Sequence, residues 1–186
     1  MLGGLTGRNA SGKSTFVEWF SAKGLRSVSC SDSIRAWLAE QGIESTREAL
    51  IDGGRELRRQ GGGGVLAEML LGILSGEDAV VDSIRTPAEV EALRERGDFF
   101  LIEVRADQEA RWERMNQRGR SGDPLDKEVF LKQEEAEASS KDEAGQALDA
   151  TAEMADITID KTGLWRNWRG SSRKCGRICL GRSNSD

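Results

Sequence analysis

The segment GLTGRNASGKST, residues 4–15, decides the fold class of this chain. Residues 7–14 match the pattern G-x-x-x-x-G-K-[ST] at every defined position. Glycines at these places let successive backbone N–H groups turn inward at the N-terminus of a helix, which creates an anion site. A short apolar run, Leu2–Leu5, precedes the pattern, and Phe16 and Phe20 follow it at helical spacing. The segment therefore predicts a strand, a phosphate-binding loop and a helix, in that order.

Two residues of this loop carry specific chemistry. A lysine at the position of Lys13 reaches the β- and γ-phosphates of a nucleotide, and a hydroxyl at the position of Ser14 can ligate Mg²⁺. The competing interpretation is a glycine- and serine-rich turn that matches the pattern by chance. The surrounding strand and helix favour the phosphate site, because the pattern demands that context.

Length and composition are typical of one globular domain. The chain has 186 residues, of which 37% are hydrophobic and 32% charged, which is enough for a sizeable core. No run approaches the ~20 apolar residues of a membrane helix, and no secretory signal precedes the loop. We therefore expect a cytoplasmic protein with no membrane partner. Histidine is absent, which excludes histidine-based acid–base catalysis and histidine-ligated metal sites.

Charge divides the chain into two parts. The net charge is −5, but residues 164–186 hold six basic side chains and one acidic one, so residues 1–163 carry −10. An acidic body repels polynucleotides, so we do not expect nucleic acid as a partner. Trp165 and Trp168 among arginines offer a nucleic-acid site as the alternative, but a disordered tail is simpler. We predict one domain over 1–163 and a basic tail, disordered or aberrant, over 164–186.

Apolar runs alternate with helical patterns along this domain, as in proteins with a parallel α/β sheet. Ser45 and Glu48 form a capping pair before one helix, and Pro87 suits the first turn of another. Four glycines, Gly61–Gly64, predict a break between two helices, with a subdomain hinge as the alternative. The expected strands are Leu2–Thr6, Arg26–Ser29, Ala79–Asp82, Phe99–Val104 and Ala155–Ile159. The expected helices are Gly12–Ala22, Ser33–Gln41, Thr46–Gln60, Val65–Leu74, Pro87–Arg96, Gln108–Arg118, Asp126–Ala138 and Lys141–Ala150.

An Asp followed three residues later by an Arg occurs at the end of two predicted strands. Asp32 and Arg35 follow the second strand, while Asp82 ends the third strand and Arg85 follows it. Open α/β sheets bind ligands at this edge, and guanidinium groups pair bidentately with phosphate, so the arginines predict a site for an anionic acceptor. We expect Asp82, after an apolar run, to hold Mg²⁺ through water together with Ser14. A helix N-cap for Asp32 and a surface ion pair for Arg85 are the alternatives.

A third cluster consists of the arginines in RWERMNQRGRSGDP, residues 111–124. Spacings of three and four residues place Arg111, Arg114 and Arg118 on one helical face, and a glycine-containing loop follows with Arg120. A solvated charged face is one interpretation. The other is a lid that closes basic side chains on a transferred phosphoryl group, stabilises its charge and excludes water.

Taken in order, the loop, SDSIR (31–35), VVDSIRTPAEVEAL (80–93) and the arginine-rich segment resemble nucleoside monophosphate kinase-like P-loop proteins. The resemblance is to the small adenylate-kinase-related proteins of archaea, and it covers about residues 1–163. The chain is also similar to P-loop domains fused ahead of deoxycytidylate deaminase-type domains. GLTGRNASGKS is similar to the start of dephospho-CoA kinases as well, but the later segments fit that family less well.

The resemblance implies a three-layer α/β/α P-loop NTPase fold with a five-stranded parallel sheet. It also implies a nucleotide-binding subdomain around Asp32–Leu74, a short lid around Arg118–Pro124 and a last strand and adenine loop in ADITIDKTG, residues 155–163. The residues carried over as catalytic are Lys13, Arg85, Arg118 and Arg120. Those carried over for the acceptor are Asp32, Arg35, Arg85 and Arg114. ATP would be held by Gly7, Arg8, Asn9, Ala10, Ser11, Gly12, Lys13, Ser14 and Thr15, and Mg²⁺ by Ser14 and Asp82.

The arginines at the sheet edge favour a monophosphate acceptor. Its attacking oxygen is already anionic, so alignment and charge neutralisation suffice without a general base. The first hypothesis is therefore an ATP-binding phosphotransferase that acts with Mg²⁺ on a small nucleotide-type substrate. A non-catalytic nucleotide sensor that controls a partner, such as a deaminase-type domain, and a dephospho-CoA kinase-like enzyme are the alternatives.

Overall fold

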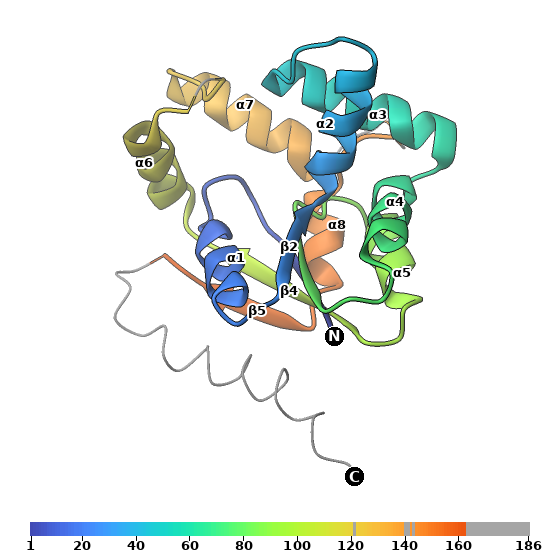
Figure 1. Ribbon diagram of the computed structural model, residues 1–186. Coiled ribbons are helices and arrows are strands. Elements are labelled where there is room, and N and C mark those ends of the chain that lie inside the picture. Colours follow the sequence, from blue (N-terminus) through green and yellow to red (C-terminus); the bar gives the residue numbers. More distant parts are fainter. Residues whose placement is uncertain (121, 140–141, 143, 163–186) are drawn as a thin grey trace.

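The computed structural model describes residues 1–120, 122–139, 142 and 144–162, and its strands and helices alternate along the chain (Figure 1). The strands are β1 (Leu2–Thr6), β2 (Arg26–Ser29), β3 (Ala79–Asp82), β4 (Phe99–Arg105) and β5 (Ile157–Asp160). The helices are α1 (Ser14–Ser21), α2 (Cys30–Glu40), α3 (Arg47–Gly61), α4 (Val65–Leu74), α5 (Pro87–Arg94), α6 (Gln108–Arg118), α7 (Lys127–Ala138) and α8 (Leu148–Glu153).

The five strands form one sheet in the order β2-β3-β1-β4-β5, and each neighbouring pair is parallel. Gly4 of β1 is in register with Val81 of β3 and Leu101 of β4. The carboxyl ends of these three strands therefore lie at one edge of the sheet. The five-stranded parallel sheet is confirmed.

Alternating side chains of the strands build a separate core on each face of the sheet, because successive residues point to opposite sides. Phe100 and Ile102 of β4 belong to the core that contains Phe16 of α1. Leu101 lies in the other core, with Val90 of α5 and residues of α2, α3 and α4. The sheet is thus covered on both faces, which confirms the three-layer α/β/α fold.

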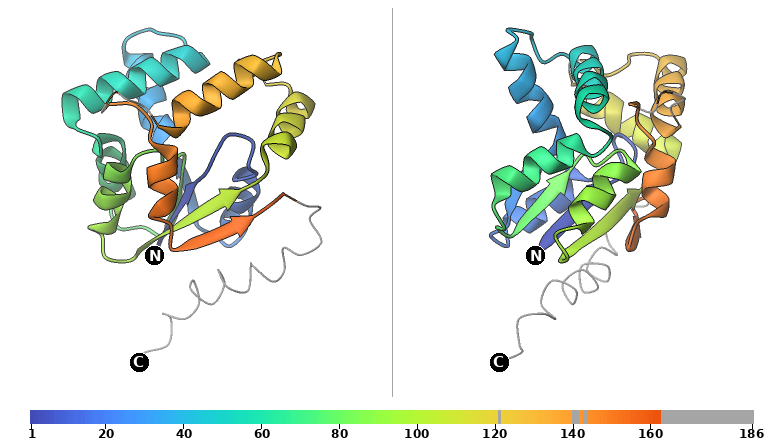
Figure 2. Two further views of the ribbon diagram at one scale, coloured as in Figure 1. Left: turned by 180° about the vertical axis from the view of Figure 1, so that it is seen from behind. Right: turned by 90° about the vertical axis from the view of Figure 1, so that its right-hand side faces the viewer.

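The connections after β1 and β3 diverge. Helix α1 packs on one face after β1, and α5 packs on the other after β3. Such a divergence between neighbouring strands opens a crevice in which open α/β sheets bind ligands. Helices α2, α3 and α7 lie beyond this edge, at the end of the molecule away from the N-terminus (Figure 2).

Capping residues fix where the helices begin. Thr86 precedes α5, accepts a hydrogen bond from the Glu89 N–H and completes a capping box with the Glu89 carboxylate, so Pro87 occupies the first turn as predicted. The predicted capping pair before α3 is wrong by one residue. Thr46 is the cap, because its hydroxyl accepts from the Ala49 N–H at 3.1 Å.

The segment before β5 differs from its prediction. The sequence predicts a helix over Lys141–Ala150, whereas the described helix spans Leu148–Glu153. The N–H of Ala147 donates to the carbonyl of Arg85 at 2.9 Å, and the Gln146 side chain accepts from the same arginine. Tertiary contacts thus replace helical hydrogen bonds just before α8.

The predicted helix break is confirmed, since α3 ends at Gly61 and α4 begins at Val65. Within the described residues, no helix has the length and apolar character that crossing a membrane requires. The predicted basic tail, 164–186, lies outside the described residues.

Candidate functional site

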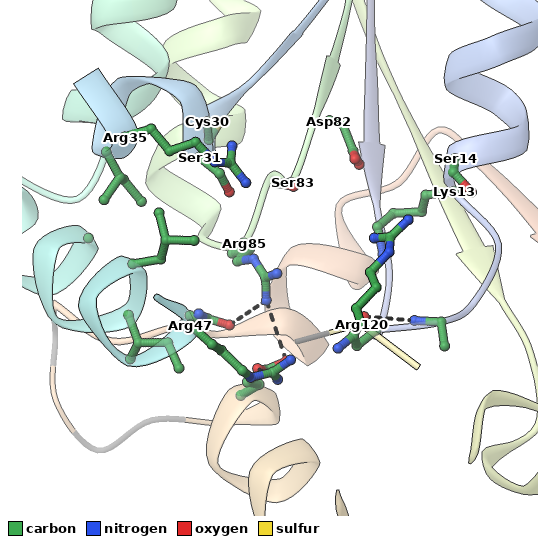
Figure 3. A pocket seen from close by; sticks show the side chains of 18 of the residues that line it. Lys13, Ser14, Cys30, Ser31, Arg35, Arg47, Asp82, Ser83, Arg85 and Arg120 are labelled. Carbon is green, nitrogen blue, oxygen red and sulfur yellow. Dashed lines mark hydrogen bonds and ion pairs between the residues drawn. The ribbon is translucent and has the colours of Figure 1, made fainter. Parts of the chain in front are cut away.

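A cavity of about 640 Å³ opens where the phosphate loop meets the carboxyl end of β3. Figure 3 shows Lys13, Ser14 and Asp82 on one side of it, and Ser31 and Arg35 across from them. Among the described residues, eight cationic side chains line the cavity against three anionic ones, although the domain as a whole is acidic. The cations are Lys13, Arg35, Arg47, Arg58, Arg85, Arg114, Arg118 and Arg120, and the anions are Asp82, Asp123 and Glu137.

The phosphate loop contains residues with positive φ angles, which residues with a side chain rarely adopt. Gly7 has a φ of 129°, and a Cβ on it would collide with the carbonyl oxygen of Val104. Gly12 has a φ of 99°, and Ala10 adopts a φ of 58° although it has a side chain. Non-glycine residues in this region store strain, which concentrates at ligand sites. The loop geometry supports the anion site that its sequence predicts.

Lys13 lies half-buried under this loop. Its Nζ donates to the carbonyl oxygens of Gly7 at 2.7 Å and Arg8 at 2.9 Å. Burial lowers the pKa of Lys13 to about 8; the Asp82 carboxylate opposes this shift and the Arg85 guanidinium adds to it. The ammonium is desolvated, so a phosphate placed beside it would be attracted strongly.

Ser14 and Asp82 present the oxygen atoms expected for Mg²⁺. Ser14 is the first residue of α1, Asp82 is the last of β3, and both line the cavity. The Oδ1 atom of Asp82 is buried and has no hydrogen-bond partner, which is costly for a carboxylate oxygen. Mg²⁺ keeps several waters and needs only one or two carboxylates. The residues present therefore fit this ion.

Arg85 is held at the crevice by two side chains. Its Nη1 donates to Gln146 Oε1 at 2.7 Å and lies 3.4 Å from Glu137 Oε2 (Figure 3). The other oxygen of Glu137 accepts from Arg47 Nη2 at 2.9 Å. The sequence predicts Arg85 here from its place after β3, but no local pattern predicts Arg47, Glu137 or Gln146.

Asp32 and Arg35 interact with one another within α2. Oδ2 of Asp32 accepts from the Ser29 N–H at 2.9 Å, which completes a capping box, and Oδ1 accepts from Arg35 at 2.9 Å. Arg35 lines the cavity, whereas the carboxylate of Asp32 serves the helix start. Ser29, not Asp32, is the N-cap of α2, and Asp32 supports the helix start from the N3 position of the capping box. Arg35 stays a predicted acceptor contact.

Arg118 connects the predicted lid segment to the phosphate loop. It donates to both carboxylate oxygens of Asp123 at 2.9 Å and to Asn9 Oδ1 at 3.0 Å. Burial would raise the pKa of Asp123, but the hydrogen bonds and charge of Arg118 hold it below its usual value. Arg120 lines the same cavity.

The remaining α6 arginines differ in their environments. Arg114 donates to the carbonyl oxygens of Lys161 and Ser11 and lines the cavity. Arg111 turns inward instead and forms a buried ion pair with Glu134 at 2.6 Å. The predicted single basic face therefore does not include Arg111, because α7 supplies a carboxylate on that side.

Two predicted loop residues make contacts away from the cavity. Arg8 pairs with Asp149 at 2.7 Å and borders a second cavity, of about 500 Å³. The hydroxyl of Thr15 accepts from Lys161 Nζ at 3.1 Å, and the same Nζ lies 3.2 Å from the Gly12 carbonyl oxygen. Burial lowers the pKa of Lys161 to about 8, and the charge of Arg114 adds to the shift. Only the resemblance of residues 155–163 to an adenine loop pointed to Lys161.

Two kinds of sequence comparison place this chain among known proteins. The family model described as AAA domain matches residues 4–140. A UPF0200 protein of Pyrobaculum aerophilum is 36% identical over 131 residues, which cover 68% of this chain and 71% of that protein. A UPF0200 protein of Pyrococcus abyssi is 33% identical over 141 residues, which cover 72% and 75%.

Solved structures show the same fold at low sequence identity. An unliganded sugar kinase from Janibacter sp. superimposes with a TM-score of 0.58 at 16% identity, covering 99% of this chain and 98% of that one. Shikimate kinase from Acinetobacter baumannii, in complex with shikimate, gives a TM-score of 0.54 at 16% identity, covering 99% and 95%. These likenesses establish a P-loop kinase-like fold. With the matches above, the chain belongs to the AAA domain family and to the UPF0200 proteins.

Proposed function

We propose that this chain is a phosphotransferase that binds ATP with Mg²⁺ and phosphorylates a nucleotide-type monophosphate. The observation that carries the proposal is the charge of the cavity, where eight cations face three anions among the described residues, although residues 1–163 have a net charge of −10. Such a local surplus of positive charge suits two phosphorylated ligands that are bound together. The P-loop kinase-like fold supports the same chemistry.

The donor end of the cavity consists of the phosphate loop, Lys13, Ser14 and Asp82. Bound ATP and Mg²⁺ would supply the phosphoryl group and a divalent charge. The loop N–H groups and Lys13 would orient and neutralise the phosphates, and Ser14 and Asp82 would hold the ion. Arg118 and Arg120, from the lid, would stabilise charge and exclude water.

The acceptor end combines charge with an apolar surface. Arg35 and Arg85 line it together with Ile34, Leu50 and Ile51. We infer that the arginines bind the acceptor phosphate while the apolar side chains contact a base. A phosphate oxygen is ionised near neutral pH, so this chain needs no residue to remove a proton from it. The absence of histidine is compatible with this chemistry.

The test is ADP release from ATP and Mg²⁺ with a panel of nucleoside and deoxynucleoside monophosphates and dephospho-CoA. We expect turnover that depends on one acceptor class and falls about 100-fold or more in Lys13→Ala, because the lysine neutralises transferring phosphates. Lys23→Ala, an exposed lysine beyond α1, is the matched control and should leave turnover unchanged. A preference for dephospho-CoA would show that the acceptor is dephospho-CoA and not a nucleoside monophosphate.

A nucleotide sensor is the second candidate, since the acceptor-side arginines already have partners within the chain. Arg35 pairs with Asp32, and Arg85 contacts Glu137 and Gln146. Nucleotide binding without acceptor-dependent ADP release, for every member of the panel, would reject the phosphotransferase. We would then expect the arginines to contact a bound ligand and to transmit its presence to a partner. We propose a deaminase-type domain as that partner.

A further inference from the structure

We propose that Glu137 occupies the acceptor-phosphate site as an internal carboxylate, and that Arg47 joins Arg85 in binding the phosphate once Glu137 is displaced. This inference rests on the proposed function, because it requires an acceptor that carries a phosphate. It adds one binding residue, Arg47, and one competing anion, Glu137, that no pattern in the sequence predicts.

The contacts of Glu137 are those that an anionic ligand would make. Its Oε1 accepts from Arg47 Nη2 at 2.9 Å, and its Oε2 lies 3.4 Å from Arg85 Nη1. The two arginines come from α3 and from the loop after β3, and both side chains extend toward the same part of the cavity (Figure 3). Two guanidinium groups that converge on two oxygens of one anion form an arrangement that also suits phosphate.

Arg47 has unused hydrogen-bonding capacity at this place. It lines the cavity, and its Nε is buried without a hydrogen-bond partner. Buried N–H groups are nearly always paired, so an unpaired one at a cavity wall is available to an additional acceptor atom. A phosphate offers three acceptor oxygens and more negative charge than a carboxylate, and can therefore satisfy more of these donors.

Helix electrostatics give a second, independent argument. Arg47 is the first residue of α3, where the helix dipole favours an anion, and Glu137 is the penultimate residue of α7, where it favours a cation. Each charge is therefore unfavourable for its own helix. Their ion pair offsets part of that cost, but the placement of the two charges does not stabilise either helix by itself. The placement is therefore better explained by ligand binding in the cavity.

Displacement of Glu137 by a phosphate would also affect the predicted lid segment. Arg47 Nη1 lies 4.0 Å from Asp123, the carboxylate that holds Arg118 against the phosphate loop. A phosphate bound between Arg47 and Arg85 would therefore change the charges next to Asp123. The acceptor site and the lid arginine share this one chain of ion pairs.

The experiment measures inorganic phosphate binding to the full chain, saturated with ADP and Mg²⁺ so that the phosphate loop is filled, by ³¹P NMR titration. Glu137→Gln should bind phosphate about tenfold more tightly than the unmodified chain, because the competing charge is gone. Adding Arg47→Met to that variant should cancel the gain. The matched controls are Glu135→Gln, exposed on α7, and Arg55→Met, which pairs with Asp52 on α3; neither should change phosphate affinity, alone or combined with Glu137→Gln.

Unchanged or weaker phosphate binding in Glu137→Gln, with ADP binding retained, would overturn the proposal, as would an undiminished gain in the double variant. If Glu137→Gln does not fold, Glu137→Asp takes its place, since the shorter side chain retracts the carboxylate and should tighten phosphate binding in the same way. Failure of the proposed function would appear differently. Phosphate binding would still respond to Glu137, but no acceptor would stimulate ADP release.

Discussion

At the scale of a single residue, the environment of Lys13 predicts a pH dependence for nucleotide binding. Burial lowers the pKa of Lys13 to about 8, and bound phosphates would raise it again by favouring the charged form. The affinity for ADP with Mg²⁺ should therefore be highest below about pH 8 and fall as the pH rises further, by up to about tenfold per pH unit. Dissociation constants between about pH 7 and 9.5 test this expectation.

Lys161 has a pKa lowered to the same range and provides the control. Burial also lowers its pKa to about 8, and its Nζ contacts Gly12 and Thr15 of the loop. The fall in affinity should persist in Lys161→Met if Lys13 is the group that titrates. A pH-independent affinity in the unmodified chain would contradict the assignment, and a fall that disappears in Lys161→Met would transfer it to Lys161.

At the scale of secondary-structure elements, one buried ion pair joins α3 to the start of α5. Glu89 is fully buried; it accepts from Arg58 Nη2 at 2.8 Å and from the backbone N–H groups of Arg85 and Thr86. Glu89→Ala would leave the buried guanidinium unpaired and remove the cap, so unfolding free energy should fall by about 3–5 kcal/mol. Urea unfolding measures this loss.

The exposed neighbour Glu91, on the same helix, serves as the comparison. Glu91→Ala should change the unfolding free energy by no more than about 0.5 kcal/mol. Replacing both partners, in Glu89→Ala with Arg58→Met, should recover part of the loss because no unpaired charge then remains buried. Equal effects of Glu89→Ala and Glu91→Ala would show that the ion pair does not hold these helices together.

At the scale of the whole molecule, the charged cavity connects ligand binding to stability. The eight cations that line the cavity in the described part of the chain repel one another, and bound polyphosphate would relieve that repulsion. A ligand that binds only the folded chain at 100 times its dissociation constant should add about 2.7 kcal/mol to the unfolding free energy. We expect this gain from ADP with Mg²⁺ in urea unfolding, smaller at high salt because screening weakens the attraction.

Lys13→Ala distinguishes this effect from nonspecific ion binding. The variant should lose most of the stabilisation by ADP while keeping the response to salt alone. Equal stabilisation of the variant and the unmodified chain would mean that the ligand binds somewhere other than the phosphate loop.

Local patterns in the sequence determined the phosphate loop, the order of strands and helices and the place of Arg85. Helices such as Val65–Leu74 and Gln108–Arg118 are predicted to the residue, because periodicity and capping depend on residues within about one turn. Arg85 and Asp82 were predictable at the crevice, because parallel strands end at one edge and the residues that follow them meet there.

Only the tertiary structure decided which side chains meet across the cavity. Arg47 and Glu137 are 90 positions apart and form an ion pair, and Arg111 turns away from the predicted lid segment to a carboxylate of α7. The residues before α8 bind Arg85 instead of continuing a helix. Such pairings depend on how α3, α6 and α7 pack beyond the sheet edge. The free energy of those contacts is set by burial and by distant charges, and no window of neighbouring residues contains that information.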